Sequence, residues 1–301
     1  MTTMGIRKIK ITFTVILIIL VVGVWAVKSI LDQIRLPLPS YFPIWEAAVT
    51  KVAILPVTFD YSPDDAAKFK IIEEFDLKSF VRSQNTTDYE LLKNILRWSS
   101  SRWAYDGDHD PQSSDPLVIL ARGKAGEKFR CVEFGKVTMA GAKVLGLASR
   151  VLKLRRKDVE IAEYGAGHVV AEVWLRDLKK WVFVDGQWGV IPELKGKPLS
   201  ATEFAEAITI RDKDLKFFSV EKQSFVNWRY PAWVAPYLYF MEYDLDQRMN
   251  MADRDSARVV LTPVGIPAPQ LFQRQKLVGR IYQTSNVSEF EAAPETSSFV
   301  R

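Results

Sequence analysis

A helical pattern of apolar residues occupies the middle of the chain. Between residues 132 and 148, apolar side chains recur every three or four positions, which is the spacing of one face of an α-helix. These positions are Val137, Ala140, Val144 and Ala148. Gly146 is suited to end such a helix, and Cys131 stands immediately before the pattern. The pattern therefore predicts a helix that begins at Cys131.

An alternating pattern follows at residues 168–175. Its apolar side carries Val169, Ala171, Val173 and Leu175, which predicts a half-buried β-strand. A polar turn at 176–180 leads to a second apolar run that ends at Asp185. A hairpin of these two runs places Asp185 opposite His168 or within about two positions of it. Facing residues in such a pair have Cβ atoms about 5 Å apart.

The longest apolar run lies at the start of the chain. Residues 11–27 are uncharged and mostly aliphatic, and Arg7, Lys8 and Lys10 precede them. A run of this length, at the short end of what spans a bilayer, predicts one transmembrane helix. The basic residues favour a cytosolic N-terminus. The alternative is a signal peptide cleaved after a small residue such as Ala26, and we favour the uncleaved anchor.

Weaker patterns organise the remaining chain. Residues 36–63 are interrupted by prolines and suggest a stalk followed by strands. Residues 88–103 and 200–210 have helical spacing, and two apolar runs near 240 and 260 predict strands. These C-terminal strands either complete the same sheet as the hairpin or form a small β-rich appendage.

Four segments result from this reading. They are an anchor or signal segment at 1–35, a stalk and lead-in segment at 36–87, a core at 88–190, and an α/β extension at 191–301 that is a candidate part of the same domain.

Composition narrows the classes of protein. The 301 residues are 48% hydrophobic and 26% charged, which is ordinary for a globular chain with an added apolar segment. The net charge of +5 is spread along the chain, and nucleic-acid binding needs a concentrated basic face. Since the chain has a single cysteine, Cys131, it forms no disulfide within itself. The thiol is then either a small buried hydrophobe or a reactive group.

The position of Cys131 favours a reactive group. Backbone N–H groups and the dipole at a helix start stabilise a thiolate. A thiolate nucleophile also needs a base, normally a histidine. The chain has two histidines, and His109 lies in a polar stretch typical of a surface loop. His168 begins the predicted strand, and Asp185 in the partner strand is placed to orient its imidazole.

Cys131, His168 and Asp185 resemble, in order and context, the transglutaminase-like superfamily, a branch of the papain-like cysteine enzymes. The segments that carry the resemblance are KFRCVEFGKVTMAGAKVLGLASRVL at 128–152, AGHVVAEVWL at 166–175 and KWVFVDGQWG at 180–189. The resemblance implies an α+β core with the cysteine at a helix N-terminus packed on an antiparallel sheet. It also implies that Cys131 is the nucleophile, His168 the general base and acid, and Asp185 the orienter.

This chain departs from the family pattern at three places, one of which is a missing proline near Ala148 that affects only the turn after the helix. Phe129 and Arg130 stand where the family usually has a glycine or serine, and Gly186 replaces the usual proline after the aspartate. Neither change removes a reacting group, so they bear on substrate shape and local backbone geometry.

Several neighbouring residues are candidates for substrate binding. Trp103, Gln187 and Trp188 lie near the motifs and are placed to line a cleft, although tryptophans also serve as core packing. The acidic stretch at 106–110 lacks the glycine and closing glutamate of an EF-hand, so a solvated loop is the better interpretation. One cysteine and two histidines leave too few ligands for zinc. We therefore expect no metal and no cofactor.

These features predict a cysteine-dependent acyl-transfer enzyme. We expect amide or peptide hydrolysis through a thioester on Cys131, outside the cytoplasmic membrane, with a peptide, a protein or cell-envelope material as substrate. The alternatives are a non-catalytic binding or scaffold module of the cell envelope and a protein cross-linking transamidase. A secreted form after signal cleavage is the alternative for location, and no nucleic-acid partner is expected.

Overall fold

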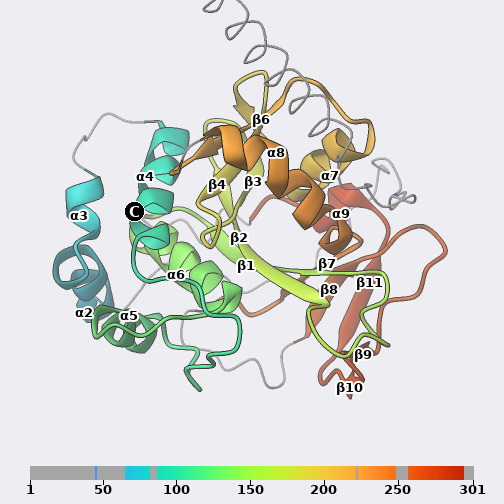
Figure 1. Cartoon of the computed structure of the whole chain (residues 1–301), viewed down its shortest axis with the longest axis horizontal. Helices are drawn as coiled ribbons and strands as arrows, with labels where there is room; N and C mark the ends of the chain where they lie inside the picture. The colour runs from blue at the N-terminus through green and yellow to red at the C-terminus, as the bar shows by residue number, and fades with distance from the viewer. Residues whose placement is uncertain (1–44, 46–64, 82–86, 222, 249–256, 295–301) are drawn as a thin grey trace, which may run out of the picture. The chain divides into compact units, whose positions relative to one another are not determined.

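The computed structural model describes residue 45 and residues 65–81, 87–221, 223–248 and 257–294 (Figure 1). The predicted membrane anchor at 1–35 and the proline-rich part of the predicted stalk at 36–63, except for residue 45, lie outside these residues. Within the ranges given, no helix is both long enough and apolar enough to cross a membrane.

The helix that carries the cysteine forms as predicted. Helix α6 spans Cys131–Val144, and Cys131 is its first residue. The Glu133 carboxylate accepts a hydrogen bond from the backbone N–H of Arg130 at 3.1 Å, which satisfies a donor at the helix start. After the helix, Gly146 adopts a φ of +79°, a left-handed conformation that glycine reaches without strain.

A six-stranded sheet forms the centre of the structure. Its strand order is β11-β8-β7-β1-β2-β3. The strands are β1 (Ser149–Arg155), β2 (Gly167–Leu175), β3 (Lys180–Val184), β7 (Phe240–Asp244), β8 (Arg258–Leu261) and β11 (Ile281–Thr284). Neighbouring strands are antiparallel except β11 and β8, which are parallel. The C-terminal strands therefore complete the same sheet as the hairpin.

The register of the β2–β3 hairpin agrees with the sequence prediction. Leu175 pairs with Lys180, and Ala171 pairs with Val184. The same register continued by one residue places Asp185 level with Val170, two positions from His168. The two predicted functional residues thus lie at the same end of one hairpin.

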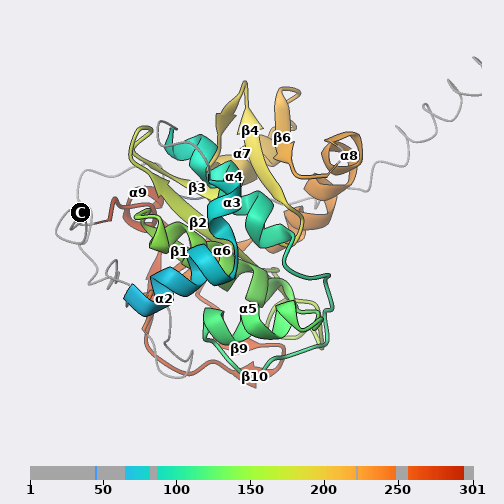
Figure 2. The same cartoon turned by 90° about the vertical axis from the view of Figure 1, so that its left-hand side faces the viewer.

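Strand β2 is buried more completely than its alternating pattern predicts. Helix α6 packs on β2, as Figure 2 shows. Residues on the other face of β2 are buried too. Glu172 on that face forms an ion pair with Arg150, with the carboxylate 2.8 Å from the guanidinium Nε. Glu172 also accepts a hydrogen bond from the backbone N–H of Ala201, at the start of helix α7 (Ala201–Thr209). The half-buried assignment was wrong because C-terminal elements, which the pattern of β2 alone does not reveal, cover these polar positions.

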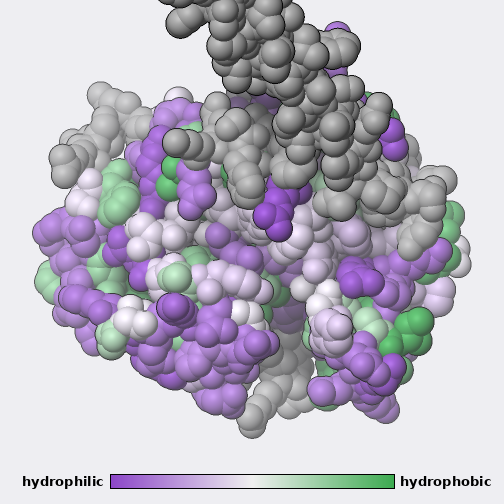
Figure 3. All heavy atoms as spheres, viewed as in Figure 1, coloured by the Kyte–Doolittle hydropathy of each residue, from purple (hydrophilic) through white to green (hydrophobic). Residues whose placement is uncertain are grey.

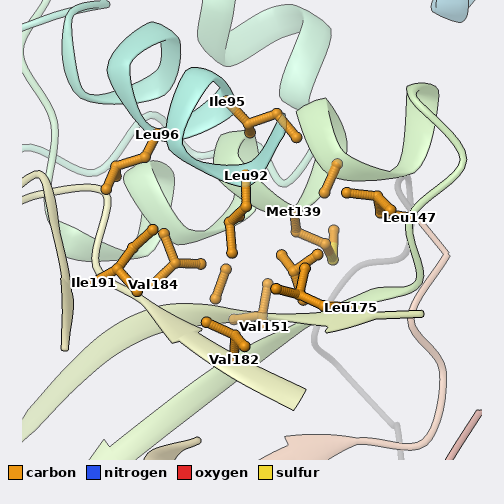
Figure 4. Packing of buried hydrophobic residues seen from close by; sticks show 13 residues of the cluster. Leu92, Ile95, Leu96, Met139, Leu147, Val151, Leu175, Val182, Val184 and Ile191 are labelled. Atoms are coloured by element: carbon orange, nitrogen blue, oxygen red, sulfur yellow. The ribbon is translucent and has the colours of Figure 1, made fainter. Parts of the chain in front are cut away.

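Helices α4 (Asp88–Ser100) and α6 cover the sheet with an apolar core (Figure 4). The buried members of this core come from both helices, from β1 to β3, from β4 and from the turn after α6. They are Leu92, Ile95, Leu96, Met139, Ala142, Leu147, Val151, Ala171, Val173, Leu175, Val182, Val184 and Ile191. Burial of this apolar surface holds α6, and with it Cys131, against the hairpin.

A second core includes residues from the predicted stalk and lead-in segment. Residues 65–81 form α2 (Asp65–Phe69), a π-helical turn (Lys70–Glu74) and α3 (Leu77–Phe80). Ile71 and Leu77 are fully buried beside Trp98, whose indole N–H donates to the carbonyl oxygen of Phe75 at 2.8 Å. This part of the 36–87 segment therefore packs with the core.

Further elements surround the central layers. They are α5 (Pro116–Lys124), β4 (Val190–Leu194), β5 (Lys197–Pro198), β6 (Leu215–Ser219), α8 (Gln223–Val234), a 3₁₀ turn (Ala235–Tyr237), β9 (Leu271–Phe272), β10 (Gln275–Lys276) and α9 (Val287–Phe290). Strands β5, β4 and β6 form a small sheet, and β9 pairs with β10. On the face seen in Figure 3, hydrophobic residues lie in small areas among hydrophilic ones, which is ordinary for a folded protein.

Candidate active site

Two glycines allow helix α6 to approach the hairpin closely. A Cβ atom on Gly135 would lie 3.1 Å from both Val169 Cγ1 and the carbonyl oxygen of Val170 in β2. A Cβ atom on Gly186, directly after Asp185, would lie 2.6 Å from Thr138 Oγ1 in α6. The separation at Gly186 is too short for a real side chain, and those at Gly135 would require the neighbouring atoms to shift by a few tenths of an ångström. Glycine at these positions therefore lets the first turns of α6 reach the end of the hairpin, and Gly186 in place of proline fits this contact.

His168 and Asp185 form a buried pair at that end. His168 Nε2 lies 2.7 Å from Asp185 Oδ2, and the two residues are 1% and 0% exposed. Cys131, which is half-buried, forms a side-chain hydrogen bond with His168. Because Nε2 faces the carboxylate, Nδ1 is the ring nitrogen left for the thiol. The structure thus brings together all three residues for which the sequence predicts a catalytic role.

The charge of the pair decides the protonation of the imidazole. Burial alone would lower the pKa of His168, but the charge of the Asp185 carboxylate and the hydrogen bonds of the imidazolium to Asp185 and Cys131 raise that pKa to about 10. The imidazole is therefore held as an imidazolium at neutral pH. A positive charge next to Cys131 is what a reactive thiolate requires.

Four hydrogen bonds fix the Asp185 carboxylate. Its Oδ1 atom accepts from the backbone N–H groups of Gln187 at 2.9 Å and Trp188 at 3.1 Å. Its Oδ2 atom accepts from Tyr230 Oη at 2.8 Å and faces His168 Nε2. The short turn after β3 and helix α8 together set the orientation of this carboxylate.

Helix α8 and the 3₁₀ turn after it supply an aromatic wall that the sequence analysis missed. The ring of Trp233 lies edge-on to His168, with 4.9 Å between ring centroids, and Tyr237 lies 6.0 Å from the same imidazole. Tyr230, Trp233 and Tyr237 are spaced three and four residues apart, which places them on one helix face. That spacing is the only sequence signal for them, and it does not indicate which part of the fold they face.

Tyr105 and Tyr237 lie near enough to Cys131 for its charge to act on both phenols. Burial raises the pKa of each phenol, and the charge of Cys131 raises both further. Tyr105 is 53% exposed, whereas Cys131 and Tyr237 are half-buried.

The three predicted substrate-binding residues have different surroundings. Trp188 packs on Tyr230 at 5.3 Å and on Trp233 at 4.9 Å, beside the imidazole. Gln187 is half-buried, and its backbone N–H binds Asp185. Trp103 packs on Phe129 and Phe134, which lie on either side of Cys131 in the sequence.

The indole nitrogens of Trp103 and Trp188 are buried and have no hydrogen-bond partner among the described residues. A buried donor without an acceptor is costly. A role in substrate binding stays a prediction for all three residues.

The second histidine lies in a separate network. His109 Nε2 is 2.8 Å from Glu127 Oε2, and Arg122 binds the same carboxylate. Asp110 of the acidic loop pairs with Arg130 at 2.8 Å. In the part of the chain that the structure describes, no three Asp, Glu, His or Cys side chains converge as metal ligands.

Comparison with protein families identifies the core. Residues 76–186 match the family described as the transglutaminase-like superfamily. The match includes Cys131, His168 and Asp185, and it confirms the resemblance inferred from the sequence. These residues are therefore similar to a transglutaminase-like core, and members of that superfamily are usually cysteine enzymes. Tyr230 and the aromatic wall lie outside the matched segment.

Solved structures also match the chain. One is the crystal structure of a TGase, which is 19% identical, with 46% of this chain and 34% of that chain covered and a TM-score of 0.31. Another, from Cytophaga hutchinsonii, is described as a candidate cysteine protease and is 13% identical, with 53% and 50% covered and a TM-score of 0.32. The chain thus spans half or less of the length of these two structures. No curated protein matches the chain.

Proposed function

We propose that the chain is a cysteine-dependent acyl-transfer enzyme that hydrolyses amide or peptide bonds through a thioester on Cys131. One observation carries this proposal: His168 is hydrogen-bonded to Cys131 and lies 2.7 Å from the carboxylate of Asp185. This arrangement supports the roles of nucleophile for Cys131, base for His168 and orienting carboxylate for Asp185.

The reaction follows from these three groups. The Cys131 thiolate attacks the carbonyl carbon of the substrate and forms a tetrahedral oxyanion. When this intermediate collapses, the carbon–nitrogen bond breaks, and the imidazolium of His168 gives its proton to the leaving amine. Water then attacks the thioester carbonyl while His168 accepts a proton from it, and the carbon–sulfur bond breaks to release the thiolate. The products are a carboxylic acid and the regenerated thiolate–imidazolium pair.

The start of helix α6 supplies a donor for the oxyanion. The backbone N–H of Cys131 has no acceptor one turn earlier in the helix, as for any first helical residue. It lies on the residue that attacks, so it is placed to bind the oxygen that becomes negative.

The proposed location rests on the N-terminal sequence. The apolar run at 11–27 with basic residues before it supports a single membrane anchor and a catalytic domain outside the cytoplasmic membrane. Peptides of the cell envelope are the substrates that such a location would offer.

Acylation of the full chain tests the function. We would incubate it with short cell-envelope-type peptides and measure released amine and acyl adducts by mass spectrometry, with Cys131→Ser as the matched control. The proposal predicts a peptide adduct on Cys131 that hydroxylamine removes, and a carboxylic acid product. Transfer of the acyl group to an added primary amine in preference to water would favour the transamidase. Peptide binding that is equal in both proteins, without any adduct, would support a non-catalytic module.

A further inference from the structure

Two donors compete for one oxygen of Asp185. Tyr230 Oη lies 2.8 Å and His168 Nε2 lies 2.7 Å from the same atom, Oδ2. Tyr230 and Asp185 are both 0% exposed, so water does not share this oxygen. The phenol is therefore part of the immediate environment of the imidazolium, although it comes from residues beyond the family match.

Packing holds the Tyr230 ring in place. Trp188 lies 5.3 Å from it, Phe217 lies 5.4 Å from it edge-on, and Phe204 is stacked at 6.2 Å. Burial and the charge of Asp185 raise the pKa of Tyr230 well above its ordinary value. The phenol is consequently protonated at neutral pH and donates to the carboxylate.

We propose that Tyr230 is a positioning residue that weakens the hold of Asp185 on the proton of His168. This inference rests on the proposed function, in which His168 must give that proton to the leaving amine. A carboxylate oxygen that accepts two hydrogen bonds carries less negative charge toward each donor than an oxygen that accepts one.

The charged groups around His168 hold its proton strongly, so the release of this proton to a leaving amine requires that the hold be weakened. Asp185 from the end of β3 and Cys131 from α6 both stabilise its imidazolium form, and the phenol of Tyr237 from the 3₁₀ turn faces the same ring. An imidazolium held by two anions in a buried site is a poor acid. Among the described residues, Asp185 is the titratable group that shifts the pKa of Tyr230. Tyr230 therefore weakens the hold of Asp185 on the imidazolium proton without adding a charge.

The titration of His168 tests the inference without a substrate. The full chain has two histidines, so ¹³C labelling at histidine Cε1 gives two NMR signals, and a His109→Gln variant assigns them. The measurement uses chains that carry Cys131→Ser, which removes the coupled titration of the thiol. Tyr230→Phe is compared with Tyr243→Phe, since Tyr243 is equally buried but contacts Arg150 and Phe290 instead.

We expect the pKa of His168 to rise by about one unit in Tyr230→Phe and to stay unchanged in Tyr243→Phe. The proton on His168 Nε2 should also move downfield in Tyr230→Phe, because its hydrogen bond to Oδ2 strengthens. If His168 stays protonated over the whole accessible pH range in both proteins, the chemical shift of the Nε2 proton is the measurement that tests the inference. An unchanged or lowered pKa, or an unchanged Nε2 proton, would overturn the inference.

If the Tyr230→Phe protein does not fold, a second substitution tests the same inference. 3-Fluorotyrosine at position 230 keeps the shape and donates more strongly, so it should lower the pKa of His168 and move the Nε2 proton upfield. No shift would overturn the inference. These readouts do not depend on catalysis. If Cys131 is not acylated but the expected shifts occur, the proposed enzyme activity is rejected and the role of Tyr230 stands. If Cys131 is acylated but the shifts are absent, the role of Tyr230 is rejected and the proposed activity stands.

Discussion

His168 Nε2 lies 2.7 Å from Asp185 Oδ2 in a site where neither residue is more than 1% exposed. An isolated charge in such a site would be strongly unfavourable, and pairing makes the imidazolium the stable form. The hydrogen bond of the same imidazole to Cys131 adds a nucleophile to this pair. The buried ion pair is therefore the physical basis of the proposed reactivity.

The ion pair makes stability depend on pH. The pKa of His168 is raised from its ordinary value of 6.5 to about 10 in the folded state. Its contribution to stability is then complete below pH 6.5, decreases above it, and is lost as the pH rises through 10. We expect the free energy of unfolding in urea to fall by a few kcal/mol more between pH 6 and pH 10 in the wild type than in His168→Gln. Parallel pH profiles would show that His168 is not held as an imidazolium.

Asp185→Asn should reduce the rate of acylation without unfolding the protein. The amide presents N–H to His168 Nε2 and so favours the tautomer that carries its proton on Nδ1, where it cannot accept one from Cys131. We expect the acylation rate of Cys131 to fall by about 10²- to 10⁴-fold. Asp244→Asn is the matched control, because it breaks a shielded ion pair with Lys153 instead of the contact with His168. Equal losses in both variants would point to a structural role for Asp185.

Gly135→Ala should separate the cysteine from the histidine. The new methyl group would lie 3.1 Å from two atoms of β2, so helix α6 and β2 must separate by a few tenths of an ångström, and we expect this shift to lengthen the contact between Cys131 and His168. We expect a loss of about 1–3 kcal/mol in stability, offset by up to about 1 kcal/mol of helix propensity, and a slower alkylation of Cys131. Far-UV circular dichroism and urea unfolding measure the first, and labelling of the thiol measures the second.

Gly141→Ala is the control for this prediction. It lies in the same helix, and its methyl group would contact the ring of Trp98 at 2.8 Å instead of β2. It should therefore lower stability and leave the reactivity of Cys131 unchanged. The account of Gly135 would be wrong if both variants slowed alkylation to the same extent.

The sequence predicts the local geometry of the site well because that geometry depends on short stretches. The helical period places Cys131 at a helix start, and the length of one turn sets His168 and Asp185 at the same hairpin end. Tyr230 escapes prediction because it lies 45 residues after Asp185. The hydrogen bond between them depends on how helix α8 packs, which no local pattern encodes.

The same distinction holds for the sheet. The strands β7 and β8 are visible as apolar runs, but the place of β7 beside β1, and of β8 beside β7, follows from long-range pairing. The burial of Glu172 also depends on residues far away, since Arg150 and helix α7 come from other segments. The alternating pattern of β2 assigns Glu172 to the solvent-facing side. In the folded protein, Arg150 and the start of helix α7 cover this side chain.

Alkylation of Cys131 by iodoacetamide as a function of pH tests the central claim most directly. It would be measured on the full chain, on His168→Ala and on the control His109→Ala, whose imidazole binds Glu127 instead. We predict rapid labelling at pH values at which an ordinary thiol, with a pKa of about 8.5, is protonated. This reactivity should disappear in His168→Ala and persist in His109→Ala. An ordinary thiol profile in the wild type, or labelling only after unfolding, would contradict the account.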